Sequence, residues 1–378
     1  MLLILLILTI LIISLIIIIL VNYNKMSYLN FNSTALIGGK NKFNPVDKYP
    51  ENEKLKFQEL EVKNYIRKKI GAHKDSKVIF TSGATESIAT VLNWIKEYNK
   101  YGTIYGSDFD HESVKLNCDN LKLKYEQIDI NELLNEKKEL KYNCSALFIT
   151  HVNPYSGEIY PFEEINEIFK SQFKEEITVD ENEFDYNNAP FKILDASQSI
   201  GKTKIEMEKW GLNAVFFSLH KLGGKLNCGV LVVKDTNKTK FKPLISGKQQ
   251  SGLRGGTYDL YSYLDFQKVY EKFLDNYDSE ECKSLWKKMF DEFKLHGLDV
   301  YEPKHKHLFN TILIKTKSCS LPIIDELAKN NIYVSGKTAC ESETDDVSTI
   351  RISFINNQIS DKIIRKIINI IQEHEMDY

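Results

Sequence analysis

The sequence predicts an α/β fold, and three observations carry that prediction. Short apolar runs recur along the middle of the chain, and each ends in polar residues. Stretches with apolar residues at helical spacing separate most of these runs. From about residue 305 onward, short strand-like and helix-like segments alternate, as in a compact α+β domain. Strands that alternate with helices form a sheet whose ligands gather at one edge.

The periodicity of apolar residues places each expected element. The expected helices lie at residues 52–70, 86–95, 111–121, 162–169, 261–274, 280–295, 321–330 and 361–372. The expected strands lie at residues 78–80, 103–105, 146–150, 193–196, 214–218, 228–234, 307–316, 331–336 and 349–354. Residues 174–189 are acidic and rich in asparagine, which indicates a solvated surface insert.

Composition excludes several classes of protein. The chain has 378 residues, of which 42% are hydrophobic, enough for one large domain and a smaller one. Its formal net charge is −2, with basic and acidic residues interspersed, so no nucleic-acid partner is expected. Six scattered cysteines form no CxxC pair, which disfavours a structural zinc site and a disulfide framework and favours a reducing compartment.

Residues 1–21 carry no charged side chain. About 20 residues of helix span the roughly 30 Å hydrocarbon core of a membrane. With no basic n-region and no cleavage site, this stretch is expected to be an uncleaved single-pass membrane anchor. Lys25 follows it and favours a cytosolic catalytic body. The other interpretation is an appended extension, since an ordinary domain start follows Met26 directly.

Two segments carry candidate chemistry at strand ends. The turn TSGAT, residues 81–85, lies between a strand and a helix, so the backbone N–H groups of Ala84 and Thr85 are candidates to bind a phosphate. Lys221 follows the strand at 214–218 and begins a glycine-rich loop. A lysine at such a strand end can form a Schiff base once it is desolvated. Taken singly, the first segment is more often an ordinary turn, and the second is more often a surface lysine at the start of a loop.

Two further residues complete a set that one cofactor requires. Asp195 ends another buried strand, and His111 begins a helix, where it is either a flat ring for stacking or only a helix cap. Pyridoxal phosphate needs a lysine, a carboxylate for its ring nitrogen, a phosphate-binding turn and a stacking side chain. The four features together therefore predict a pyridoxal phosphate site.

Seven motifs, in order along residues 27–371, resemble those of the class V aminotransferase superfamily, and specifically of NifS-type cysteine desulfurases. They are YLNFNST, FTSGATES, DASQSIGK, FFSLHKLGG, GLRGGT, VSGKTAC and IRISF. The resemblance implies the pyridoxal-phosphate-dependent transferase fold type I: a mainly parallel large-domain sheet with helices on both faces, and a smaller α+β C-terminal domain. The chain is accordingly divided into an anchor (1–21), an extended segment and linker (22–50), a cofactor-binding domain (51–260) and connecting helices with the small domain (261–378).

The resemblance also implies a role for each matching residue. The cofactor phosphate would be held by Ala84, Thr85, Ser218 and His220, and across a homodimer interface by Thr257. His111 would stack on the cofactor ring, Asp195 would pair with the ring nitrogen, Gln198 would meet the phenolate oxygen, and Lys221 would be the Schiff-base lysine. Arg351 would bind the substrate carboxylate near Asn153, and Cys340 would be the nucleophile. No role falls to a metal ion.

The implied reaction converts L-cysteine to L-alanine. Lys221 would remove the Cα proton, and the Cys340 thiolate would take the sulfur as a persulfide for an acceptor protein. Two alternatives stay open. One is another class V enzyme, a selenocysteine lyase or an aminotransferase-like enzyme. The other is a degenerate, membrane-anchored homologue without activity.

The chain departs from the family pattern at named positions. Pro154 stands at the second asparagine of the family's HVNNExG motif. Leu219 and Lys225 replace a small residue and a proline around the lysine motif. The segment between Cys340 and Arg351 is shorter than in the housekeeping iron–sulfur desulfurases.

Overall fold

The computed structural model describes residues 50–135, 140, 144–172, 190–235, 239–277, 280–336, 348–354 and 359–376. The chain divides into two compact units, Met1–Lys56 and Phe57–Tyr378. Within the residues that the structure describes, no helix has the length and apolarity needed to cross a membrane. The expected anchor at 1–21, the acidic insert at 174–189 and Cys340 lie outside the described residues.

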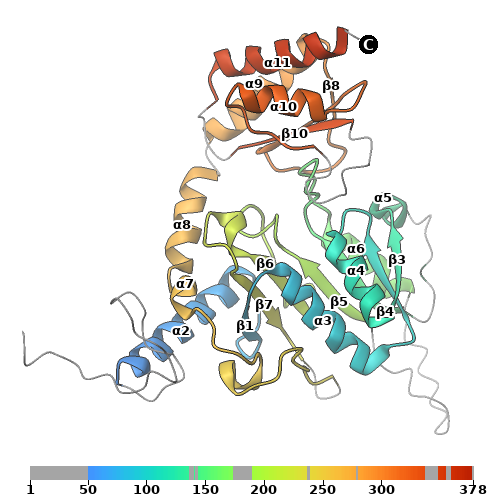
Figure 1. Cartoon of the computed structure of the whole chain (residues 1–378). Helices are drawn as coiled ribbons and strands as arrows, with labels where there is room; N and C mark the ends of the chain where they lie inside the picture. The colour runs from blue at the N-terminus through green and yellow to red at the C-terminus, as the bar shows by residue number, and fades with distance from the viewer. Residues whose placement is uncertain are drawn as a thin grey trace, which may run out of the picture. The chain divides into compact units, whose positions relative to one another are not determined.

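A seven-stranded sheet organises the larger part of the second unit (Figure 1). Its strands are β1 (Lys77–Thr81), β2 (Thr103–Ser107), β3 (Lys124–Ile128), β4 (Cys144–Thr150), β5 (Phe191–Asp195), β6 (Ala214–Ser218) and β7 (Gly229–Val233), in the order β1-β7-β6-β5-β4-β2-β3. Strand β7 runs antiparallel to β1 and β6, and the remaining pairs are parallel. The predicted mainly parallel α/β sheet is confirmed.

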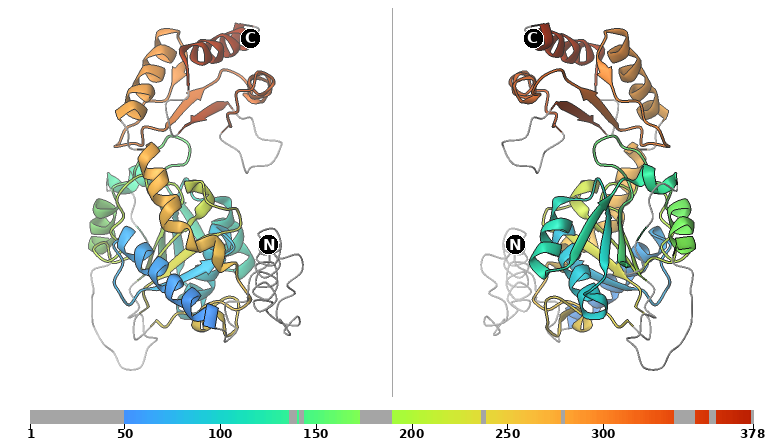
Figure 2. Two further views of the ribbon diagram at one scale, coloured as in Figure 1. Left: turned by 90° about the vertical axis from the view of Figure 1, so that its left-hand side faces the viewer. Right: turned by 90° about the vertical axis from the view of Figure 1, so that its right-hand side faces the viewer.

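Helices cover both faces of this sheet, because successive side chains of a strand point to opposite faces. Phe216 of β6 belongs to the core that α3 (Ala84–Asn99) forms with the sheet, together with Trp94. Its neighbour Phe217 instead packs against Phe266 of α8 (Phe266–Tyr277), with ring centroids 5.9 Å apart. Helix α2 (Pro50–Lys69) lies beside α8, as the left view of Figure 2 shows.

The remaining elements of the sheet region connect its strands or follow the last of them, β7. They are α4 (Glu112–Leu121), α5 (Ile130–Leu134), α6 (Phe162–Gln172), the 3₁₀ turns η1 (Leu219–Leu222) and η2 (Gln249–Gly252), and α7 (Leu260–Leu264). Helix α4 packs against α3 and β3, which extends the same core.

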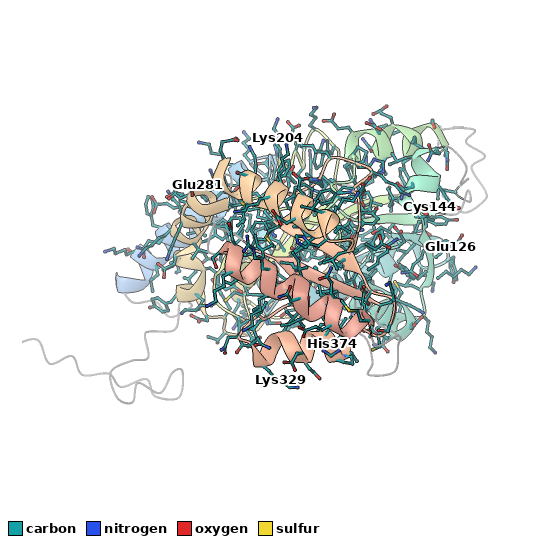
Figure 3. All side chains as sticks on the ribbon, turned by 90° about the horizontal axis from the view of Figure 1, so that it is seen from above. Glu126, Cys144, Lys204, Glu281, Lys329 and His374 are labelled. Atoms are coloured by element: carbon teal, nitrogen blue, oxygen red, sulfur yellow. The ribbon has the colours of Figure 1, made fainter. Side chains whose placement is uncertain are left out.

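The C-terminal part has its own sheet and its own apolar core. Strands β8 (Asp299–Val300), β9 (Thr311–Lys315) and β10 (Thr349–Ser353) form an antiparallel sheet in the order β10-β9-β8. Helices α9 (Glu280–Leu295), α10 (Leu321–Lys329) and α11 (Asp361–Met376) supply most of the remaining core residues. Figure 3 views α10 and α11 from outside, with Lys329 and His374 near their C-terminal ends. This arrangement is the expected α+β part.

The structure corrects three local expectations. The helix expected at 261–274 is divided into α7 and α8, because Asp265 leaves the helical conformation with a ψ of 2°. Residues 331–336 form no strand: Asn331 adopts a left-handed φ of 59° directly after α10, and only Ser335 pairs, by a single bridge to Arg351. The expected strand at 307–316 is shorter, since β9 begins at Thr311.

Candidate active site

A pocket of about 1180 Å³ opens where the main-sheet strands other than β7 end. Nine of the predicted site residues line it: Ala84, Thr85, His111, Asp195, Gln198, Ser218, His220, Lys221 and Arg351. Asn153 and Thr257 are not among its lining residues, and Cys340 lies outside the described residues. Residues spread over more than 260 positions of sequence therefore meet at one sheet edge, because parallel strands end on the same side.

The wall of the pocket after β1 is the start of helix α3. The Ala84 backbone N–H donates to the Ser218 hydroxyl at 2.9 Å, which joins this turn to the end of β6. N–H groups in the first turn of a helix have no partner within the helix and favour an anion. Of the two N–H groups predicted to bind a phosphate, that of Ala84 donates to Ser218 in this structure, and that of Thr85 lies in the first turn of α3.

An ion pair between Glu86 and Arg254 holds the same turn in place. The Glu86 carboxylate accepts from Arg254 Nε at 2.9 Å and Nη2 at 3.1 Å, and from the Ser82 backbone N–H at 2.8 Å. Burial alone would raise the pKa of Glu86, but the hydrogen bonds from Arg254 and Ser82 hold it below its ordinary value. Because Arg254 lies on the loop of the GLRGGT motif, that loop and the turn are held together.

Asp195 ends β5 with its side chain buried, 6% exposed. Burial raises the pKa of the Asp195 carboxyl, while the hydrogen bond from the Ser197 backbone N–H, 2.8 Å long, and the charge of Lys221 oppose that rise. The carboxyl therefore lies in a poorly solvated position where a cationic partner gains most. A protonated ring nitrogen is a partner of that kind.

Lys221 lies in η1, the 3₁₀ turn that follows β6. Its side chain is exposed on the pocket wall, whereas the chemistry inferred from the sequence assumes a desolvated amine. The reason is local: η1 carries the chain away from the buried strand, and Gly223 ends it in a left-handed conformation with φ 79°. The amine nevertheless shares the pocket with Asp195 and the α3 turn.

The structure shows His111 as a helix cap, and its stacking role stays a prediction. It is the N-cap of α4, where its Nδ1 accepts from the Ser113 backbone N–H at 3.2 Å. It also lines the pocket. The cap fixes the ring at the pocket wall, which is what stacking on a flat ligand would need.

Arg351 reaches the pocket from β10 of the C-terminal part. Its Nη1 donates to the Pro154 backbone carbonyl at 2.9 Å. Pro154, which stands at the family's asparagine position, thus still contacts Arg351, but it does so through its backbone carbonyl. Asn153 serves the loop instead: its Oδ1 accepts from the backbone N–H groups of Tyr155 and Ser156, at 2.8 and 3.1 Å.

The sequence did not predict the role of Glu158, a buried acid that holds the loop after β4 in place. Glu158 is 4% exposed and accepts from the Tyr301 hydroxyl at 2.9 Å and from the Lys304 backbone N–H at 2.6 Å. These bonds attach the loop that follows β4 to the segment between β8 and β9. They help to hold Pro154 where Arg351 contacts it.

A second missed acid, Asp110, joins side chains of three neighbouring strands, β2, β3 and β4. Its carboxyl accepts from Thr150 Oγ1 at 2.7 Å, from the Tyr125 hydroxyl at 3.2 Å and from the Ser107 hydroxyl. Gly106 is required beside it, because a Cβ there would collide with the Asp110 carboxyl and with Tyr125. Burial raises the pKa of Asp110 to about 7, and the nearby charge of Asp195 adds to that rise.

This raised pKa predicts a pH dependence of stability. Between about pH 4 and 7, folded Asp110 keeps a proton that an unfolded aspartate has lost. Its contribution to the free energy of unfolding is therefore fully present below about pH 4 and is lost as the pH rises through 7. We expect the difference in unfolding free energy between the parent and Asp110→Asn to fall over this range, measured by urea denaturation. Asp119→Asn removes an exposed carboxylate of α4 as the control, and an equal pH trend in both variants would contradict the assignment.

The fold and the pocket together define a class of enzyme. A mainly parallel sheet that brings a helix start, a buried carboxyl and a lysine to one pocket is the arrangement of a pyridoxal-phosphate-dependent α/β enzyme. Residues 51–364 match the family model described as aminotransferase class-V, so the chain belongs to that family. Members of this family depend on pyridoxal phosphate, and the residues present fit that cofactor.

Individual relatives agree with this assignment. Over 296 residues the chain is 27% identical to "Cysteine desulfurase IscS" of Buchnera aphidicola subsp. Baizongia pistaciae, covering 74% of this chain and 68% of that protein. It is 30% identical over 207 residues to "Cysteine desulfurase, mitosomal" of Trachipleistophora hominis, covering 50% of this chain and 42% of that protein. With several relatives the match spans about half of their length or less.

Solved structures show the same fold. A "NifS-like protein" superposes with a TM-score of 0.72 at 21% identity, covering 89% of this chain and 92% of that one. A NifS-like protein from Rickettsia africae superposes with a TM-score of 0.70, also at 21% identity, with the same coverage of both chains. At these identities the likeness concerns the fold.

Proposed function

We propose that the protein is a cysteine desulfurase that converts L-cysteine to L-alanine and holds the sulfur on Cys340 for transfer. The observation that carries the proposal is the pocket in which Lys221, Asp195 and the α3 turn meet Arg351. Such a pocket binds an amino acid through its carboxylate and places it beside a lysine and the residues that bind a cofactor. The names of the relatives add the desulfurase activity to that chemistry.

The residues divide the work between binding and proton transfer. The α3 turn, Ser218 and His220 would hold the phosphate group of the cofactor, and Asp195 would pair with its ring nitrogen. Bound pyridoxal phosphate supplies an electron sink for charge that develops at the substrate Cα. Arg351 orients the substrate carboxylate by paired N–H donors. Lys221 Nζ removes the Cα proton and returns a proton when alanine forms.

The sulfur step balances without any added oxidant or reductant. The Cβ–S bond of L-cysteine breaks, and a new S–S bond joins that sulfur to the Cys340 thiolate. The electron pair of the broken bond stays with the carbon fragment, which takes up a proton and leaves as alanine. The enzyme keeps a persulfide, and an acceptor protein then removes its outer sulfur.

The role of Cys340 is tested with a matched cysteine control. Cys340→Ser should lower sulfide and alanine production from L-cysteine by roughly 10²-fold or more, since it removes the nucleophile. Cys319→Ser alters a cysteine that is partly exposed in the described part of the chain, and it should retain parental rates. Equal loss in both variants, or no loss in Cys340→Ser, would remove Cys340 from the mechanism. Release of selenide from selenocysteine, but no sulfide from cysteine, would favour a selenocysteine lyase instead.

The proposal includes a homodimer in which Thr257 serves the partner's pocket. Thr257 is exposed and is not among the residues lining its own pocket, which supports this arrangement. We expect Thr257→Ala and Lys221→Ala homodimers to be impaired, and a mixture that exchanges subunits to regain activity, because one of its two sites has both residues. A mixture no more active than its components would contradict the shared site.

The proposal also includes a membrane anchor at residues 1–21 with a cytosolic catalytic body. The uncharged sequence of this stretch and Lys25 behind it support that placement. Fractionation of cells that express the full chain, followed by protease treatment of intact membranes, is the test. A catalytic body that is cleaved only from the non-cytosolic side would contradict the orientation.

A further inference from the structure

A half-buried lysine, Lys202, lies next to the pocket-lining residue Gln198. Its Nζ donates to Gln198 Oε1 at 3.0 Å. Burial lowers the pKa of Lys202 to about 8, and the positive charges of Lys221 and Arg351 add to that effect. Gln198 lines the pocket, whereas Lys202 is not among the lining residues. Lys202 therefore acts on the pocket through Gln198.

The turn that follows β5 sets this pair at a fixed spacing. The Ile200 backbone N–H donates to Ala196 O at 2.9 Å and the Thr203 N–H to Ser199 O at 3.0 Å, so residues 196–203 form helix-like turns. The contact between Lys202 and Gln198 forms across these turns. Gly201 lets this turn pack closely against η1: its φ is 72°, and a Cβ there would lie 2.9 Å from Leu222 Cδ2.

The chemistry of the two side chains fixes which way the amide points. An ammonium group has donors and no acceptor, so only the carbonyl oxygen of the Gln198 amide can face Lys202. The NH₂ group then points away from Lys202. Because Gln198 lines the pocket, that group is the one available to a ligand there.

We propose that Lys202 is a positioning residue that locks the Gln198 amide with its N–H donors toward an anionic oxygen of the bound cofactor. Lys202 also places a positive charge behind that oxygen. Both effects stabilise the deprotonated form of the oxygen and so lower the pH at which the bound cofactor titrates. The inference rests on the cofactor site of the proposed function and adds to it a residue that orients the site from behind.

The test is a spectroscopic pH titration of the full-length protein with pyridoxal phosphate bound. Lys202→Met keeps the length of the side chain and removes the donor and the charge. The midpoint of the change in visible absorption should rise by about one pH unit, the equivalent of one hydrogen bond. Lys202→Arg should restore most of the parental midpoint. Lys204→Met is the matched control, since the Lys204 side chain is 77% exposed two residues away (Figure 3), and it should leave the midpoint unchanged.

A second pair of variants keeps the test decisive if Lys202→Met folds poorly. Gln198→Leu should raise the midpoint by itself, and adding Lys202→Arg or Lys202→Met should then change little, because the amide that the lysine orients is gone. Independent, additive shifts would overturn the inference, and so would an unchanged midpoint in a folded Lys202→Met. A parent that shows no visible cofactor absorption would contradict the proposed function itself, which separates the two failures.

Discussion

Lys221→Ala is expected to lower alanine formation from L-cysteine by on the order of 10³- to 10⁴-fold or more. The variant loses the amine that anchors the cofactor and the base that moves the Cα proton, and either loss alone is severe. The side chain is exposed, so the free energy of unfolding should change by less than about 0.5 kcal/mol. The measurement pairs an alanine assay with chemical denaturation of parent and variant.

Lys225→Ala is the matched control for this prediction. Lys225 is an exposed lysine of the same loop, and its Nζ contacts Ser262 Oγ at 3.1 Å. We expect Lys225→Ala to retain activity within a few-fold of the parent. If Lys221→Ala kept comparable activity, Lys221 would have neither the anchoring nor the proton-transfer role.

Gly229→Ala is expected to destabilise the fold and to weaken cofactor binding together. A Cβ on Gly229 would lie 2.5 Å from the Gly83 carbonyl carbon and 2.6 Å from Gly83 Cα. Gly229 pairs with Thr81 at the end of β1, directly before the phosphate-binding turn. The backbone of that turn must therefore move, which we expect to cost about 3 kcal/mol of unfolding free energy, as overpacking of a tight site does. Denaturant titration and a cofactor-binding titration measure the two effects.

Gly223→Ala separates steric from conformational effects. Gly223 has a φ of 79°, and nothing lies within 4 Å of a Cβ placed there. Its substitution should therefore cost only the backbone strain of a left-handed residue, about 1 kcal/mol. A Gly229→Ala variant no less stable than Gly223→Ala would show that the Gly83 turn is not packed as described.

The strands that sequence reasoning located share a physical signature. Runs such as VIF and AVFF are apolar throughout because both faces of the strand are buried. Strand β3, KYEQI, was missed because it lies at the edge of the sheet and buries only Ile128. Residues 331–336 looked like a strand from composition alone, but Asn331 turns the chain away after α10.

Some residues of the candidate site could be predicted from the sequence, and others could not. Residues inside contiguous motifs, such as Lys221 and Asp195, could be predicted because their neighbours in sequence identify them. Asp110 and Glu158 could not, since their partners Thr150 and Tyr301 lie 40 and 143 residues further along the chain. Lys202 stood inside a recognised motif, yet its contact with Gln198 depends on a turn geometry that only the structure gives.

A single-turnover experiment tests whether the sulfur of L-cysteine is transferred to Cys340. Purified protein with bound pyridoxal phosphate is mixed with L-cysteine without reductant or acceptor, and alanine is quantified alongside the mass of the peptide that contains Cys340. The account predicts one alanine per active site and a mass increase of one sulfur atom on Cys340 that reductant removes. Alanine without sulfur on Cys340, or no alanine from a protein that binds the cofactor, would contradict it.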